Sequence, residues 1–153
     1  MYTLVIVDDE QMILVGIADL FPWENIGFNV VGKFTNAREA LSYLEENPVD
    51  VVMTDIKMPG MDGLSFAEKI KTDPDRIIVI LSSYSDYDYM RRALKVEVTD
   101  YLLKPINYGE LSECFDKIKG ILDGRNKVSE SDETPYYDKI IRQIDTYLEE
   151  NFQ

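Results

Sequence analysis

Five short apolar runs alternate with five amphipathic stretches along this chain, and that alternation limits the possible folds more than any other feature of the sequence. The apolar runs cover residues 3–7, 28–34, 49–54, 77–81 and 100–103. Runs without polar interruption, such as residues 77–81, are typical of strands that are covered on both faces. Because strands that alternate with helices are joined by right-handed crossovers, the sequence predicts an α/β fold with a parallel sheet and helices on both faces.

Apolar residues at helical spacing predict five helices between and after these strands. They are expected over residues 10–21, 36–47, 64–70, 86–95 and 108–122. Asn36, followed three residues later by Glu39, resembles a capping box and marks the start of the second helix. Lys33 lies in the second strand, which suits a strand at the edge of the sheet. The inward-facing side chains expected in the fourth helix are Tyr89, Met90, Ala93 and Leu94.

The last part of the chain differs from the rest in composition. We expect one domain over residues 1–122, followed by a linker over residues 123–135, which are rich in polar residues and have few apolar ones. Residues 136–153 then predict an extra helix with an apolar stripe. This helix is either the start of a truncated second domain or a surface that packs on a partner, for example as a short two-helix seam. Both interpretations stay open.

The composition also excludes several kinds of function. The formal net charge is -13, and the chain contains no histidine. Such an acidic chain repels nucleic acid, and it offers neither an imidazole base nor a histidine ligand for a metal. The single Cys114 cannot form an internal disulfide. We find no leader sequence and no apolar run of membrane-spanning length, and we therefore expect a cytoplasmic protein that does not enter a membrane.

Polar residues with a common chemistry follow four of the predicted strands. Asp8 and Asp9 end the first strand, Asp55 the third, Ser82 the fourth and Lys104 the fifth. If the strands are neighbours, the carboxylates share one pocket and repel one another unless a cation lies between them. Three carboxylates without histidine or thiolate favour Mg²⁺, with Asp55 as a nucleophile towards a phosphoryl group that Lys104 and Ser82 would hold.

Each of these signals has an ordinary structural explanation when it is taken alone. Adjacent acids after a strand are usually a solvated turn or favourable charges at a helix N-terminus. Asp55 before a turn rich in proline and glycine is explained by turn chemistry, Ser82 by helix capping and Lys104 by a loop. The functional interpretation is preferred because all four signals occur at the carboxyl ends of buried strands.

With these residues in view, the chain resembles the receiver domain of two-component response regulators over about residues 2–122. The resemblance depends on Val-Asp-Asp-Glu at 7–10, Thr-Asp-Ile-Lys-Met-Pro-Gly-Met-Asp-Gly at 54–63, Leu-Ser at 81–82 and Tyr-Leu-Leu-Lys-Pro at 101–105. It implies a flavodoxin-like sheet of order 2-1-3-4-5. It also implies self-catalysed phosphotransfer and autodephosphorylation, and not a conventional enzyme.

The resemblance assigns a role to each motif residue. Asp55 would accept the phosphoryl group from a histidine kinase. Mg²⁺ would be held by Asp8 or Asp9, by Asp55 and by the backbone carbonyl of Lys57. Lys104 would pair with the phosphoryl group, the Lys104–Pro105 peptide would be cis, and Ser82 and Tyr101 would form the switch pair. Ser83 departs from the family, in which a smaller residue is usual, and it puts the lifetime of the phosphoryl group in doubt.

The same resemblance suggests partners. These are a sensor histidine kinase and a second copy of the chain, bound either through the face formed by the fourth helix, fifth strand and fifth helix or through the C-terminal helix. Residues 81–89 resemble receivers that precede an arabinose-regulator (AraC) type helix-turn-helix domain, and residues 140–152 are similar to the first helix of such a domain. DNA would be bound only through the rest of that domain, which is absent from this sequence.

Two alternatives remain. One is a phosphohydrolase that forms an aspartyl-phosphate intermediate, but such enzymes usually have a second aspartate two residues after the nucleophile, where this chain has Lys57. The sequence also lacks an insertion large enough to cap a substrate. The other is a pseudo-receiver that only binds partners, which is disfavoured because the acidic residues, Ser82 and Lys104 are all present.

Overall fold

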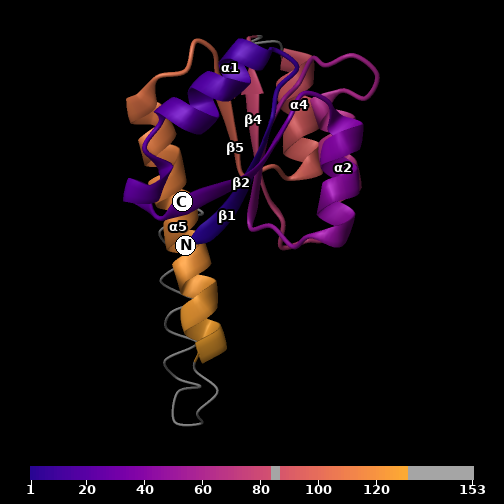
Figure 1. The fold of residues 1–153 in the computed structure, drawn as a ribbon. Helices are drawn as coiled ribbons and strands as arrows, with labels where there is room; N and C mark the ends of the chain where they lie inside the picture. Colours follow the sequence, from indigo (N-terminus) through magenta and orange to yellow (C-terminus); the bar gives the residue numbers. More distant parts are fainter. Residues whose placement is uncertain (84–86, 131–153) are drawn as a thin grey trace. The chain divides into compact units, whose positions relative to one another are not determined.

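The computed structural model describes residues 1–83 and 87–130 of the chain. Its strands are β1 (Tyr2–Val7), β2 (Phe28–Phe34), β3 (Val51–Asp55), β4 (Ile77–Ser82) and β5 (Asp100–Leu103). Its α-helices are α1 (Gln11–Val15), α2 (Ala37–Glu46), α3 (Gly63–Ile70), α4 (Tyr87–Val96) and α5 (Tyr108–Glu130). The strands form one parallel sheet of order β2-β1-β3-β4-β5, as the sequence predicted (Figure 1).

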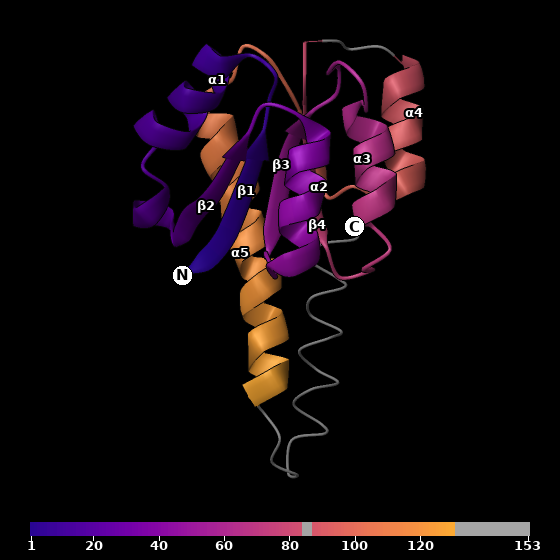
Figure 2. The ribbon, with the colours of Figure 1, turned by 45° about the vertical axis from the view of Figure 1, so that its right-hand side comes forward.

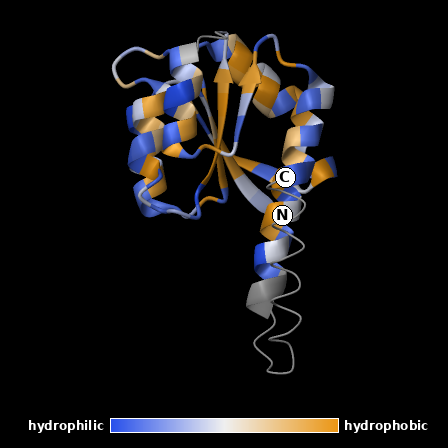
Figure 3. Cartoon of the chain, turned by 180° about the vertical axis from the view of Figure 1, so that it is seen from behind, coloured by the Kyte–Doolittle hydropathy of each residue, from blue (hydrophilic) through white to orange (hydrophobic). Residues whose placement is uncertain are grey.

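The apolar runs form strands because the centre of the sheet buries their side chains. Every residue of β3 and β4 is buried, whereas β2 at the edge of the sheet is mostly half-exposed. Figure 3 shows the hydrophobic colour concentrated on the central strands, while the helices carry both colours. At that edge, the pairing of β1 with β2 shifts between Leu4 and Val5, which leaves one extra residue in β2.

Helices cover the two faces of the sheet. Figure 2 shows α1 on one side and α2, α3 and α4 on the other. The core on the second side includes Val5, Ala40, Val52, Leu64, Phe66 and Ile78. As the sequence predicted, the Asn36 side chain caps α2 by accepting a hydrogen bond from the backbone N–H of Glu39 at 2.9 Å. The described residues contain no helix that is both long and apolar enough to cross a bilayer.

The first helix is less regular than predicted. It is α-helical only to Val15, and residues Gly16–Leu20 (η1) are wound as a π-helix. The Trp23 side chain, in the short 3-10 helix η2 (Trp23–Ile26), donates a hydrogen bond to the carbonyl of Ile17 at 2.8 Å. The Trp23 side chain thus bonds a backbone carbonyl that would accept a backbone N–H if the α-helix continued. The apolar periodicity of the sequence does not reveal this contact.

The inward face of α4 was predicted wrongly in part. Ala93 is buried, but the side chains of Met90 and Leu94 are 43% and 75% exposed. Successive residues of an α-helix turn by about 100°, so Leu94 does not share the direction of Ala93. The apolar stripe predicted for α4 is wider than the face that the helix buries.

The fifth helix is longer than predicted. It was expected to end at Leu122, before a linker over residues 123–135, but α5 continues to Glu130. Lys119 pairs with Asp123 at 3.1 Å one turn further on. No proline lies between the start of α5 at Tyr108 and Pro135 that would stop the helix. Compactness divides the chain into residues 1–112 and 113–153, a boundary inside α5. The predicted C-terminal helix, residues 136–153, and the rest of the predicted linker lie outside the described residues.

Candidate functional site: a carboxylate cluster with a buried lysine

The sheet register brings the predicted strand ends to one edge. Val7 pairs with Thr54, so Asp8 and Asp55 each follow a paired position on neighbouring strands. On the other side of β3, Asp55 pairs with Leu81, which precedes Ser82. The carboxyl ends of β1, β3 and β4 therefore lie at the same level, which is where ligands collect on parallel sheets.

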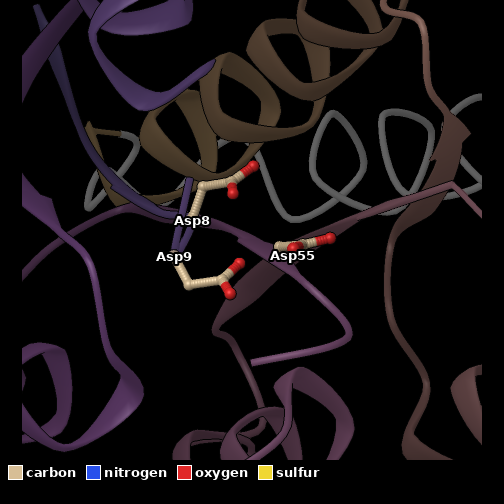
Figure 4. Close-up of side chains that lie close together, drawn as sticks. All are labelled: Asp8, Asp9 and Asp55. Carbon is tan, nitrogen blue, oxygen red and sulfur yellow. The ribbon is translucent and has the colours of Figure 1, made fainter. Parts of the chain in front are cut away.

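Three carboxylates meet at this edge. Asp8, Asp9 and Asp55 each place one oxygen within 4.8 Å of the others, and Figure 4 shows the three side chains close together near the ends of two strands. Asp8 and Asp55 are buried, and Asp9 is the most accessible of the three. One oxygen of Asp8 accepts a hydrogen bond from the backbone N–H of Glu10 at 2.9 Å, which fixes the direction of this carboxylate.

A buried lysine lies between two of these carboxylates. The Nζ atom of Lys104 is 2.8 Å from Asp8 Oδ2 and 3.3 Å from Asp55 Oδ1, and its side chain is only 8% exposed. The backbone holds it there, because Lys104 N–H donates to the carbonyl of Ser82 at 2.8 Å. The peptide from Lys104 to Pro105 is cis, as the family resemblance implied. Lys104 thus supplies one positive charge against three negative ones, which leaves the pocket anionic.

The electrostatics of the pocket show this imbalance. Burial, and next the charge of Asp8, raise the pKa of Asp55 to about 6, and Lys104 opposes the rise only in part. Burial alone would lower the pKa of Lys104, but its hydrogen bond to Asp8 and the charges of Asp8 and Asp55 outweigh burial and raise it. The lysine therefore stays charged, while Asp55 is costly to ionise in this pocket without a further cation.

The turn after Asp55 depends on a glycine that sequence analysis only counted as part of a motif. A Cβ atom at Gly63 would collide with the backbone carbonyl of Asp55. The N–H of Gly63 donates to the carbonyl of Ile56 at 2.7 Å, so the chain closes a tight loop and α3 begins directly against the reactive strand end. Asp62 caps α3 by accepting from the N–H of Ser65 at 2.7 Å. The requirement at Gly63 is a close backbone approach, which spacing along the sequence cannot show.

Ser82 and Tyr101 lie on the same face of the sheet. Tyr101 pairs with Ile80, two residues before Ser82, and paired residues on neighbouring strands share a face. Ser82 is fully buried, and the Tyr101 ring is half-buried against the core cluster that includes Ile80. This places the aromatic side chain on the face into which the Ser82 side chain projects.

Lys57 was predicted to hold Mg²⁺ through its backbone carbonyl, and that role stays a prediction. It follows Asp55 by two residues in the loop between β3 and α3, and its side chain is exposed. Its ammonium lies over the ring of Tyr89 in α4, at 5.9 Å from the ring centroid. No other cluster of three or more acidic, histidine or cysteine side chains that could hold a metal occurs within the described residues.

The donor set fits a hard divalent cation. Carboxylate oxygens are the ligands that Mg²⁺ prefers, and histidine and thiolate donors are absent from the cluster. The raised pKa of Asp55, which burial and the charge of Asp8 cause, is the expected sign of an acidic cluster that favours a cation. Asp8, Asp9 and Asp55 are the residues that would hold the ion.

The fold and the site together define a class of protein, a doubly wound α/β domain with an acidic pocket and a lysine at the carboxyl edge of its sheet. Comparison with protein families makes this specific. Residues 4–116 match the response regulator receiver domain, and the chain belongs to this family. It is a receiver domain and not a conventional enzyme.

Individual relatives agree with this assignment. The chain is 36% identical over 119 residues to the transcriptional regulatory protein YesN of Bacillus subtilis, covering 77% of this chain and 32% of the relative. It is 31% identical over 165 aligned positions to the transcriptional regulatory protein HptR of Staphylococcus aureus, covering 100% of this chain and 65% of HptR. The chain thus spans less than two thirds of either protein.

A solved structure matches over nearly its whole length. It is the receiver domain of AraT, a response regulator from Geobacillus stearothermophilus, which superposes with a TM-score of 0.76 at 31% sequence identity. The match covers 82% of this chain and 98% of the AraT structure.

Proposed function

We propose that this protein accepts a phosphoryl group on Asp55 from the phosphohistidine of a sensor kinase and thereby switches a transcriptional output. The observation that carries the proposal is the position of Lys104, whose ammonium contacts Asp8 and Asp55 together. Such an ammonium neutralises one phosphoryl oxygen while Asp55 reacts, and positioning with charge neutralisation supplies most of the catalysis in phosphoryl transfer.

In the proposed reaction, a carboxylate oxygen of Asp55 attacks phosphorus and forms a P–O bond. The P–N bond to the kinase imidazole breaks, and the imidazole leaves with its electron pair. When bound, Mg²⁺ neutralises the carboxylates and the charge on the phosphoryl oxygens. Later attack by water on phosphorus breaks the P–O bond to Asp55, releases inorganic phosphate and regenerates the Asp55 carboxylate. Ser83 is exposed next to Ser82, and we propose that it affects the lifetime of the phosphoryl group through the entering water.

The proposed switch uses Ser82 and Tyr101. The Ser82 hydroxyl would move to donate to a phosphoryl oxygen, and the Tyr101 ring would follow into the space that it leaves. The shared face of these two residues and the burial of Ser82 support this coupling. The new negative charge on Asp55 supplies the differential interaction that such a switch requires.

The proposed output surface lies on α4, β5 and the start of α5. Four large apolar side chains are exposed there, Met90 at 43%, Leu94 at 75%, Leu103 at 44% and Tyr108 at 48%. Exposed apolar groups of this kind mark interaction sites, and a second copy of the chain is the proposed partner. The alternative dimer contact, through residues 136–153, falls outside the described residues.

The proposed output is the control of transcription in the cytoplasm. YesN and HptR are described as transcriptional regulatory proteins, and both are longer than this chain. We propose that an AraC-type DNA-binding domain follows the receiver in the complete regulator. With a net charge of -13, this chain itself is unsuited to hold DNA.

A decisive experiment is intact-mass analysis after incubation with acetyl phosphate, with Mg²⁺ and with EDTA, beside the Asp55→Asn variant. An adduct of one phosphoryl group that requires both the metal and Asp55 is expected. The matched control is Asp50→Asn, because Asp50 is also an acid near the sheet but accepts its hydrogen bonds among the described residues from Thr3, at the opposite end of the strands. An equal adduct in Asp55→Asn would place the acceptor on another residue and refute the proposal.

A further inference from the structure

The helix α4 is tied to the loop after Asp55 by two cationic contacts. Lys57, two residues after Asp55, places its ammonium 5.9 Å from the centroid of the Tyr89 ring. Asp62, the capping residue of α3, lies 4.0 Å from the guanidinium of Arg92. One partner of each pair is in the loop that connects the reactive strand to α3, and the other is on α4, which lies beside α3 (Figure 2).

The two contacts use one face of α4. Tyr89 and Arg92 are three residues apart, so they project from neighbouring turns of the same side of the helix. Met90 and Leu94 are four residues apart and form a different stripe, which is exposed. Any movement that releases the first face also changes the position of the exposed apolar stripe, because both belong to one rigid helix.

We propose that Lys57–Tyr89 and Asp62–Arg92 form a clamp that holds α4 in the unphosphorylated position and that phosphorylation of Asp55 weakens this clamp by breaking its Lys57–Tyr89 contact. This inference rests on the proposed function, because phosphorylation of Asp55 is the event that would break the contact. Besides the Ser82–Tyr101 pair, these two contacts would couple the state of the carboxylate pocket to the position of the exposed apolar stripe on α4.

The physical reason for release is a competition for Lys57. Phosphorylation replaces the single negative charge of the Asp55 carboxylate by a phosphoryl group with a charge of about -1.5 to -2 at neutral pH, two residues from Lys57 in the sequence. An ammonium group is attracted more strongly to such an anion than to the quadrupole of an exposed aromatic ring. The ammonium therefore leaves the Tyr89 ring when Asp55 is modified. Half of the clamp, the partly exposed and weaker Asp62–Arg92 contact, then remains.

The test compares Tyr89→Leu, which removes the ring, with Tyr89→Phe, which keeps it. Two quantities are measured on the full chain, the hydrogen exchange of the α4 peptide without any phosphoryl donor and the rate of phosphoryl uptake from acetyl phosphate with Mg²⁺. Contacts of this strength shift a two-state equilibrium by about threefold each. We expect Tyr89→Leu to raise both quantities about threefold, and Tyr89→Leu with Arg92→Gln to raise them about tenfold, while Tyr89→Phe, which keeps the ring, raises them less than Tyr89→Leu does.

A double-mutant comparison with Lys57→Met tests whether the contact itself is responsible. If Lys57 and Tyr89 act through each other, removing the second partner after the first has no further effect on α4 exchange. Equal α4 exchange and equal uptake in Tyr89→Leu and Tyr89→Phe would overturn the clamp. If the wild type takes up no phosphoryl group, the proposed function fails separately, and the exchange comparison, which needs no donor, still decides whether the clamp holds α4.

Discussion

Lys104 and Asp8 form a buried ion pair across 96 positions of the sequence, with 2.8 Å between Nζ and Oδ2. Asp8 is fully buried, and the lysine side chain is nearly so. Removing one partner of a buried pair leaves an uncompensated charge, which is costly. The same lysine contacts Asp55 at 3.3 Å, so its loss would leave two buried carboxylates without a protein cation.

We therefore expect Lys104→Ala to lower the free energy of unfolding by about 3–5 kcal/mol at pH 7 without Mg²⁺. Mg²⁺ should still bind, because the three carboxylates remain and the competing ammonium is gone, and saturating metal should recover part of the loss. Urea denaturation with EDTA and with Mg²⁺ measures both effects. Self-association that depends on phosphorylation, followed by sedimentation, should be impaired.

The matched control for this variant is Lys33→Ala. Lys33 also pairs with an aspartate, Asp19, at 3.2 Å, but both side chains are about half exposed. Exposed pairs contribute about 0–1 kcal/mol. A loss in Lys104→Ala no larger than that in Lys33→Ala would show that burial of the pair has no energetic consequence, and unaltered self-association would remove Lys104 from the coupling.

The raised pKa of Asp55 predicts an unusual pH dependence. The pKa of this group is about 6 in the folded chain and 3.8 when unperturbed, so between these values the folded state binds more protons than the unfolded state. Stability without metal therefore falls as the pH rises through this window. The ionised Asp55 should cost about 1–2 kcal/mol above pH 6, after allowance for solvent screening.

The variant Asp55→Asn isolates this contribution, since the amide does not titrate. In EDTA, the free energy of unfolding of Asp55→Asn should exceed that of the wild type at pH 7 and approach it near pH 4. Chemical denaturation at both pH values measures the difference. A difference that does not change with pH would mean that Asp55 keeps an ordinary pKa in the folded chain.

Gly63 provides a steric prediction. In Gly63→Ala, the new Cβ would meet the carbonyl of Asp55, so the loop after β3 must shift and the start of α3 with it. We expect a loss of about 2–4 kcal/mol in the free energy of unfolding and slower phosphoryl uptake. Gly16→Ala is the control, because a Cβ at Gly16 meets nothing within 4 Å. Thermal unfolding of both variants compares them, and equal melting temperatures would contradict the close approach.

Sequence analysis located the pocket because its signals are local. Asp8, Asp55 and Lys104 each follow an apolar run, and the parallel sheet brings such ends to one edge without further information. Properties that depend on how backbone segments pack against each other in space were not predictable in this way. The need for glycine at Gly63 arises from a backbone 8 positions earlier, at Asp55.

The errors in α4 and α5 have the same origin. An apolar residue at helical spacing does not reveal whether a neighbour covers it, and Leu94 is 75% exposed although the pattern of α4 predicted it inside. For α5, the polar composition of residues 123–130 indicated a linker, but charged residues are also good helix formers and an ion pair at Lys119–Asp123 supports continuation. Composition alone does not separate a solvated helix from a linker.

The exposed side chain of Leu94 leads to the final prediction. If α4 contributes to a contact between two copies after phosphorylation, Leu94→Glu places a charge on that contact and should weaken phosphorylation-dependent self-association at least tenfold, since burying an unpaired charge is costly. Phosphoryl uptake should be unchanged, because Leu94 lies outside the pocket. The control is Leu20→Glu, which changes a side chain of similar exposure, 73%, on η1. Sedimentation with acetyl phosphate and Mg²⁺ measures the effect, and equal self-association of both variants would move the contact away from α4.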